Sequence, residues 1–301
     1  MFAVLGRQIS VGRGVAAALT SVVACAGLCG CGDSARNDQA RTSRTVTVRV
    51  ADAVHHAART SRPERAHAKA RTQVRARSPL PLAGRVVGVD PGHNGRNYTD
   101  PGYIDHQIFN GREPEACDTT GTETDAGYTE ARFNWNVATR LVAELHREGA
   151  RVVLTRHSND GVGPCVTRRA QIMNRAHVAV EISIHANGGP PSGRGFAILE
   201  PVADGINNRS LHGSYRFARI LRSRFARTGM GISTYDGVDG LQPRDDLAGE
   251  NLVREPYALL ECGNMRNAAD AALLSSPRWQ RGAAAAIASA ITRFLSRPAG
   301  R

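Results

Sequence analysis

The stretch Val86–His93, with the sequence VVGVDPGH, decides the fold. Its apolar half is typical of a short buried strand, and the Asp-Pro-Gly turn ends that strand with His93 at its tip. In α/β sheets, the loops that follow the carboxyl ends of strands carry the ligand-binding groups. His93 is therefore a candidate metal ligand. An ordinary loop histidine could have the same local sequence, so the metal-site interpretation depends on whether other ligands occur elsewhere in the chain.

Apolar runs and helical patterns alternate along residues 85–298, which we assign to one folded domain. The predicted strands are Val86–Val89, Arg151–Thr155, Val178–Ile184, Phe196–Leu199 and Tyr257–Leu260. The predicted helices are Glu130–Glu148, Val166–Ala176, Leu211–Thr228 and Pro277–Leu295. This alternation favours a single α/β domain, whose twisted, mostly parallel or mixed central sheet is flanked by helices on both faces.

Residues 1–31 have the features of an export signal. Arg7 and Arg13 precede an apolar run of small residues that is too short for a comfortable membrane span. The run ends in Leu-Cys-Gly-Cys at residues 28–31, which resembles a bacterial lipobox and predicts lipidation of Cys31, with plain secretion as the alternative. We expect an exported protein of the periplasm or cell envelope, either lipid-anchored through Cys31 or secreted.

Residues 32–84 are predicted to be a disordered basic linker. Residues 32–78 hold 11 Arg or Lys against 4 Asp or Glu and show no sustained apolar period. The alternative is an arm that holds the protein near anionic envelope polymer or lipid. Residues 79–301 carry only +3 of the chain's net charge of +12, so the folded part lacks the basic excess of a nucleic-acid binder, and we predict no nucleic-acid partner.

A Gly-, Asp- and Thr-rich segment, residues 94–129, is longer than an ordinary loop, so it is functional or has a small structure of its own. It contains Cys117, whose plausible partner in another loop is Cys165. In an exported protein this pair predicts a disulfide that ties the segment to the next helix. The remaining Cys262 lies at an apolar strand end and is predicted to be a buried packing residue, because a nucleophile would need an activating histidine.

Glu130 opens a predicted helix on the face that points to the core. Asn134, Val137, Leu141 and Leu145 follow it at helical spacing and form the core-facing stripe. A carboxylate that faces inward needs a partner, a proton or a metal ion. A frayed helix start at the surface is the alternative.

Two further strands end in ionisable side chains. Residues 180–189, VEISIHANGG, present His185 in the same way as the first strand presents His93, and residues 257–264, YALLECGN, present Glu261. Catalytic zinc sites commonly use three nitrogen or oxygen ligands and leave a position for water. The convergence of these three strand ends and the inward-facing Glu130 predicts a metal site of His93, Glu130 and His185. In this site Glu261 is a further ligand, a structural carboxylate or a general base.

These motifs, in this order and spacing, resemble the zinc-dependent N-acetylmuramoyl-L-alanine amidases of the amidase-3 type, and in particular their compact actinobacterial (mycobacterial-type) members. The resemblance spans residues 86–295 and includes VDPGH at 89–93, LTR at 154–156, SIHAN at 183–187 and ECGN at 261–264. It implies a peptidoglycan hydrolase that cleaves the amide between N-acetylmuramic acid and L-alanine of the stem peptide with zinc-activated water. It places one Zn²⁺ on His93, Glu130 and His185 and makes Glu261 the catalytic glutamate.

The resemblance extends to the Cys117–Cys165 pair, which matches a disulfide of the actinobacterial branch. The partners that it implies are peptidoglycan or muropeptide fragments, bound by a monomer. Asn187 is a candidate substrate contact, Arg156 is expected to pair with an acid, and His106 is not expected to be a ligand.

Two other functions are compatible with the same residues. A zinc-dependent wall peptidase or deacetylase could use the same ligands on another bond, and a non-catalytic peptidoglycan-binding regulator could keep the fold. Such regulators typically lose a ligand or the glutamate, whereas all four residues are present here.

Overall fold

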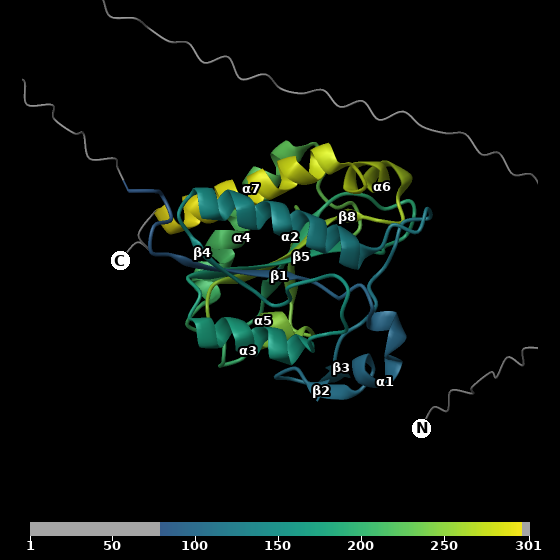
Figure 1. The fold of residues 1–301 in the computed structure, drawn as a ribbon, viewed down its shortest axis with the longest axis horizontal. Coiled ribbons are helices and arrows are strands. Elements are labelled where there is room, and N and C mark those ends of the chain that lie inside the picture. The colour runs from purple at the N-terminus through teal and green to yellow at the C-terminus, as the bar shows by residue number, and fades with distance from the viewer. Residues whose placement is uncertain (1–78, 297–301) are drawn as a thin grey trace, which may run out of the picture. The chain divides into compact units, whose positions relative to one another are not determined.

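A six-stranded mixed sheet forms the centre of the molecule, in the strand order β4-β1-β5-β8-β6-β7 (Figure 1). The computed structural model describes residues 79–296, so the predicted signal, Cys31 and most of the linker lie outside the described residues. The strands are β1 (Val86–Pro91), β4 (Arg151–Leu154), β5 (Val180–Asn187), β6 (Ala197–Pro201), β7 (Leu241–Arg244) and β8 (Tyr257–Asn264). Strands β4, β1, β5 and β8 are parallel, β6 runs antiparallel to β8, and β7 is parallel to β6.

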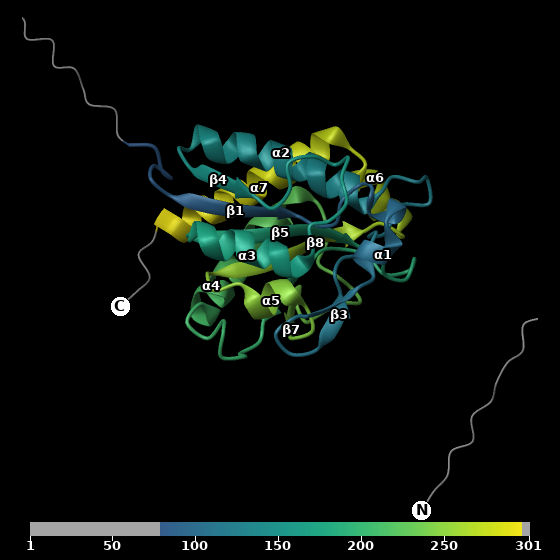
Figure 2. The same cartoon turned by 60° about the horizontal axis from the view of Figure 1, so that its bottom comes forward.

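Helices cover both faces of the sheet, as the sequence predicts (Figures 1 and 2). On one face lie α2 (Glu130–Arg147), α4 (Leu211–Phe225) and α7 (Pro277–Ser296). On the other lie α3 (Val166–Ala176) and the short α5 (Ala248–Leu252), while α6 (Ala268–Leu274) follows β8. Within residues 79–296, no helix combines the length and the apolar character needed to cross a membrane.

The two faces of the sheet differ in chemistry. Along β5, Val180, Ile182 and Ile184 belong to the main core beneath α2, α4 and α7. Side chains alternate along a strand, so Glu181, Ser183 and His185 of β5 point to the α3 and α5 side. A central parallel strand is usually apolar on both faces. Here one face holds the packing core and the other carries polar groups, which fixes where a reactive site can form.

Segment 94–129 has a small structure of its own. It contains a 3-10 turn at Asn97–Thr99, the short helix α1 (Pro101–Ile104) and a hairpin of β2 (Gln107–Phe109) and β3 (Pro114–Ala116). The predicted disulfide between Cys117 and Cys165 is present and joins the end of this hairpin to the start of α3.

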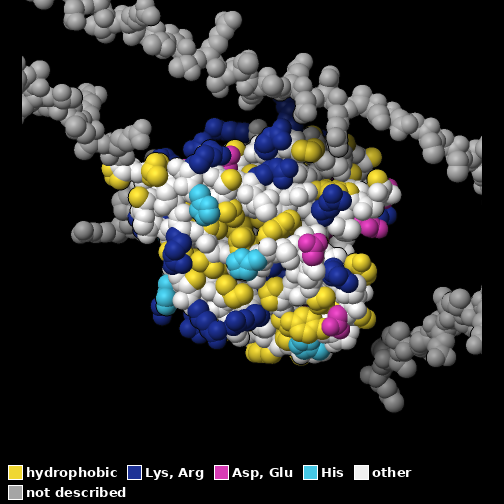
Figure 3. Space-filling model, in the orientation of Figure 1, with side chains coloured by type: hydrophobic (Ala, Val, Ile, Leu, Met, Phe, Trp, Pro, Cys, Tyr) yellow, Lys and Arg dark blue, Asp and Glu magenta, His cyan; other side chains and the backbone are white. Residues whose placement is uncertain are grey.

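Basic side chains are dispersed over the face shown in Figure 3. They lie in separate groups over α2 and around α3, with apolar and neutral surface between the groups. The positive charge of the folded part is therefore not gathered into a single patch on this face.

Candidate active site

His93 projects from the turn that follows β1. Its backbone has a φ of 57°, a left-handed conformation that is uncommon for a residue other than glycine and persists only where surrounding contacts fix it. The Nε2 atom lies 3.2 Å from Glu130 Oε1, and Nδ1 lies 3.3 Å from Asp118 Oδ1 and 3.2 Å from the main-chain oxygen of Thr119. A Cβ atom at Gly92 would overlap the ring of His185, so the Asp-Pro-Gly turn needs its glycine here.

Glu130 is the first residue of α2, and its side chain is buried, as the apolar stripe predicts. Its Oε1 accepts a hydrogen bond from the main-chain N–H of Ala186 at 3.2 Å and lies 2.9 Å from His185 Nδ1. Its Oε2 accepts from the main-chain N–H of Thr122 at 3.0 Å. These two main-chain N–H groups hold the Glu130 carboxylate so that Oε1 lies between the imidazole rings of His93 and His185.

The ligand atoms of His93, Glu130 and His185 lie within 4.8 Å of one another. Two imidazole nitrogens and one carboxylate oxygen form the donor set of many catalytic zinc sites. Burial opposes charge on His93, but the carboxylates of Glu130 and Asp118 outweigh it and raise the pKa of His93 to about 10. Burial likewise opposes ionisation of Glu130, yet the two histidines hold its pKa well below the usual range. The ionised carboxylate and the two ring nitrogens fit a zinc ion, whose binding would displace the proton that His93 otherwise holds.

Glu261 lies next to this group. It pairs in register with His185 across β5 and β8, so both side chains project from the same face of the sheet. Its Oε2 has no hydrogen-bond partner in the described part of the chain, and burial together with the nearby charge of Glu130 raises its pKa well above the usual range. Buried carboxyls with raised pKa values are suited to proton transfer. The next residue, Cys262, points to the opposite face and is fully buried, which confirms it as a packing residue.

A buried network of ion pairs around Arg169 contacts His93. Arg169 of α3 donates to Asp118 Oδ2 at 3.0 Å, to Asp90 Oδ1 at 2.8 Å and to the main-chain oxygen of His93 at 3.0 Å. The sequence patterns gave no sign of Asp118, although it directly follows a disulfide cysteine. Its position beside His93 depends on the path of the hairpin.

Arg156 forms no ion pair with an acid among the described residues, so that expectation is wrong for this part of the chain. Its guanidinium donates to the main-chain oxygens of Pro91 at 2.8 Å and Ala131 at 2.9 Å, and it lies over the ring of Trp135. The turn after β1 leaves carbonyl groups without strand partners, and a buried carbonyl needs a donor. Arg156 supplies it and thereby stabilises the turn that carries His93.

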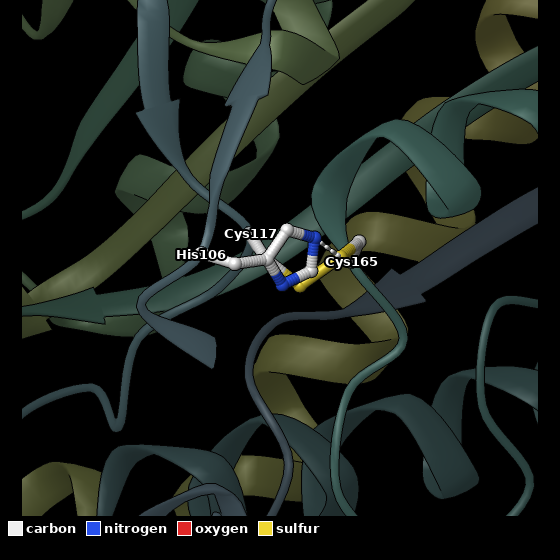
Figure 4. A group of neighbouring side chains, drawn as sticks. All are labelled: His106, Cys117 and Cys165. Carbon is white, nitrogen blue, oxygen red and sulfur yellow. Dashed lines mark hydrogen bonds between the residues drawn. A yellow bond between two sulfur atoms is a disulfide. The ribbon is translucent and has the colours of Figure 1, made fainter. Parts of the chain in front are cut away.

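His106 lies beside the disulfide rather than at the zinc-type site (Figure 4). Its Nε2 is 3.7 Å from Cys165 Sγ, and His106, Cys117 and Cys165 form a compact group. The two sulfur atoms are bonded to each other and so are not available as thiolate ligands. In the oxidised protein this group has a structural role.

The sequence profile of the N-acetylmuramoyl-L-alanine amidase family, Amidase_3, matches residues 87–293. The chain belongs to this family. The amidase domain is 40% identical over 220 residues to an N-acetylmuramoyl-L-alanine amidase of Mycobacterium tuberculosis, across 73% of this chain and 90% of the relative.

Solved structures of mycobacterial amidases share this fold. The amidase Ami1 of Mycobacterium smegmatis superimposes with a TM-score of 0.66 at 40% identity, over 71% of this chain and 98% of Ami1. The apo form of Ami1 from Mycobacterium abscessus gives a TM-score of 0.66 at 39% identity, over 71% of this chain and 100% of that protein. Both the predicted family and the predicted α/β fold of this amidase domain are confirmed.

Proposed function

We propose that the chain hydrolyses the amide bond between N-acetylmuramic acid and the L-alanine of the stem peptide, in peptidoglycan or in muropeptide fragments. Membership of the amidase family supports this activity. The observation that carries it is the convergence of His93, Glu130 and His185 beside the unpartnered carboxyl of Glu261. This arrangement supplies both a metal site and a proton acceptor in one place.

The metal in this proposal is one Zn²⁺ ion, held by the nitrogens of His93 and His185 that face Glu130 and by the Glu130 carboxylate. Amidases of this family are generally zinc-dependent. A bound zinc ion polarises the scissile carbonyl and lowers the pKa of its water from about 16 to about 7. Asp118 and the Thr119 carbonyl hold the far nitrogen of His93, which keeps its Nε2 directed at the site.

Glu261 is the general base of the proposed reaction. It takes a proton from the attacking water and returns it to the nitrogen of the leaving L-alanine. No described residue donates a hydrogen bond to Glu261 Oε2, which leaves this oxygen available to accept the proton. Asn187, which donates to Asp236 at 2.6 Å at the end of the same strand as His185, is the proposed substrate contact.

The proposed location of the protein follows from its proposed peptidoglycan substrate. Cell-wall amidases are generally exported, and we propose that residues 1–31 direct export to the cell envelope, with either lipid attachment at Cys31 or plain secretion. In the same proposal a basic linker precedes the catalytic domain and the protein is a monomer. The predicted boundary at residues 84 and 85 is too late, because Leu82 is fully buried in the core of the domain.

Mass spectrometry of digested muropeptides tests the proposal. The zinc-loaded full-length protein is expected to release peptides with a free L-alanine amino group and muramic acid without peptide. The chelator 1,10-phenanthroline should abolish this release, and added zinc should restore it. A wall peptidase would leave a shortened stem on muramic acid, a deacetylase would release acetate, and a regulator would leave the fragments intact. Any of these three results would overturn the proposal.

A further inference from the structure

A cavity of ≈ 180 Å³ lies between the polar face of the sheet and helices α3 and α5. Its outer end is formed by His93, Asp118 and the exposed Thr119, next to the proposed zinc ligands. Its wall extends along β5 from His185 to Glu181, which is four residues and so roughly 13 Å further along the strand. The proposed hydrolysis uses only the outer end of this cavity.

Two buried acids in the cavity wall have oxygen atoms without a hydrogen-bond partner among residues 79–296. Glu181 of β5 and Glu250 of α5 are each 1% exposed. The unpartnered atoms are Glu181 Oε2 and both carboxylate oxygens of Glu250. Unsatisfied buried polar groups are rare in native proteins, because each loses its hydration without replacement. Three acceptor oxygens in one cavity wall therefore point to a ligand that donates to them.

Within residues 79–296, no basic side chain pairs with these acids. Among the ion pairs of the described residues, none includes Glu181 or Glu250. The described cavity wall contains three basic side chains, and each is paired with another acid: Arg169 with Asp90 at 2.8 Å and Asp118 at 3.0 Å, and His93 and His185 with Glu130 at 3.2 Å and 2.9 Å. Burial accordingly raises the pKa of Glu250 to about 8 and that of Glu181 well above its usual range.

The rest of the wall indicates which cation fits. It contains apolar side chains suited to a hydrocarbon chain: Val166, Ala170, Leu247, Val253 and Leu259. A tightly bound metal ion is disfavoured, since in the described part of the chain the groups of three donors within 4.8 Å include neither Glu181 nor Glu250. A primary ammonium group carries three N–H donors, which matches three unpartnered acceptor oxygens.

We propose that this cavity binds an aliphatic primary ammonium group, which donates to Glu181 and Glu250 while its alkyl chain packs on the apolar wall. The ammonium group belongs either to a basic side chain of the peptide substrate or to a free alkylamine. The first source rests on the proposed amidase function, because it brings the peptide past the zinc ligands into the cavity. The second source is independent of that function.

Calorimetric titration of the zinc-loaded full-length protein with n-butylammonium chloride tests the site without measuring activity. We expect one binding site whose affinity falls at least tenfold in Glu181→Gln and in Glu250→Gln. The matched control is Glu113→Gln, an exposed acid in the β2–β3 turn, which should bind as the wild type does. Amine bound to the zinc ion itself would be unaffected by the two cavity variants.

Further titrations distinguish binding at the proposed site from misfolding of a variant and from non-specific binding of an alkyl chain or a cation. Glu250→Leu extends the apolar wall, so it should fold with a cooperative unfolding transition and yet fail to bind the amine. Uncharged n-butanol and potassium chloride should not bind in the wild type. Absence of n-butylammonium binding, equal binding of n-butanol or potassium, or undiminished binding by both glutamine variants overturns the proposal.

A substrate pair identifies the source of the ammonium group. Muramyl tripeptides with lysine or norleucine as the third residue differ in that one group. A KM at least tenfold lower for the lysine peptide, lost in Glu250→Gln, assigns the site to the substrate side chain. Equal KM values together with n-butylammonium binding assign it to a free amine. A protein that hydrolyses neither peptide contradicts the amidase proposal, and the calorimetry still decides the cavity.

Discussion

At the scale of single residues, the site depends on how the far side of His93 is held. Its Nδ1 lies 3.3 Å from Asp118, and Arg169 donates to the other oxygen of Asp118 at 3.0 Å. Histidines that bind metals usually donate their second ring N–H to a carboxylate or carbonyl, which fixes the tautomer and the ring orientation. Asp118 is therefore a positioning residue for the proposed zinc ligand.

Asp118→Ala is expected to weaken zinc binding about 10- to 100-fold, because the ring of His93 loses its orienting partner. Competition for zinc with a chromophoric chelator measures this change. Asp105→Ala, which removes an exposed acid of the same segment, is the control and should leave the zinc affinity unchanged. An Asp118→Ala protein that binds zinc as tightly as the wild type would show that Asp118 does not position His93.

At the scale of secondary structure, the elements that carry the site could be predicted from sequence, and the edge strand β7 could not. Strands β1, β5 and β8 are apolar runs that end in His93, His185 and Glu261, and this pattern is visible without a structure. Strand β7 has the sequence LQPR, with no alternation and a proline that is tolerated because the strand lies at the sheet edge.

Two contacts around His93 were also beyond prediction. Asp118 meets His93 only through the path of the β2–β3 hairpin, and Arg156 was expected to pair with an acid but binds main-chain carbonyls. In both cases the partner is determined by tertiary structure, which periodicity and spacing do not describe.

The disulfide between the hairpin and α3 gives a prediction at this scale. Its two cysteines, Cys117 and Cys165, are 48 residues apart, so removing the cross-link enlarges the conformational freedom of the unfolded chain. The double substitution to alanine should lower the free energy of unfolding by about 4 kcal/mol, as measured by guanidinium denaturation. Dithiothreitol should destabilise the wild type similarly and leave the double variant unchanged. A loss below about 1 kcal/mol contradicts this role.

At the scale of the whole molecule, the sheet separates two environments. One face packs the apolar side chains of α2, α4 and α7, and the other carries the buried acids Glu181 and Glu250 and the partly buried Glu261. Burial raises the pKa of each of these carboxyls. The stability of the protein therefore depends on pH through the polar face.

Glu250 allows this dependence to be measured. In the folded protein burial raises its pKa from 4.5 to about 8, so the unfolded chain loses the proton at a lower pH than the folded chain. The contribution of Glu250 to the free energy of unfolding is fully present below pH 4.5 and is lost as the pH rises towards 8. Between pH 5 and 8, denaturation should show that Glu250→Gln loses less stability than the wild type, by on the order of 3 kcal/mol. Parallel stability curves would rule out a protonated Glu250.

The central claim is that His93, Glu130 and His185 bind the zinc ion, whereas Glu261 transfers the proton. It is tested most directly by measuring zinc content and hydrolysis in the same preparations. Glu261→Gln is expected to retain one zinc per chain while muropeptide hydrolysis falls about 10²- to 10⁴-fold, since only the proton acceptor is lost. His185→Ala is expected to lose both zinc and hydrolysis. Wild-type hydrolysis by Glu261→Gln, or full zinc content in His185→Ala, would contradict the account.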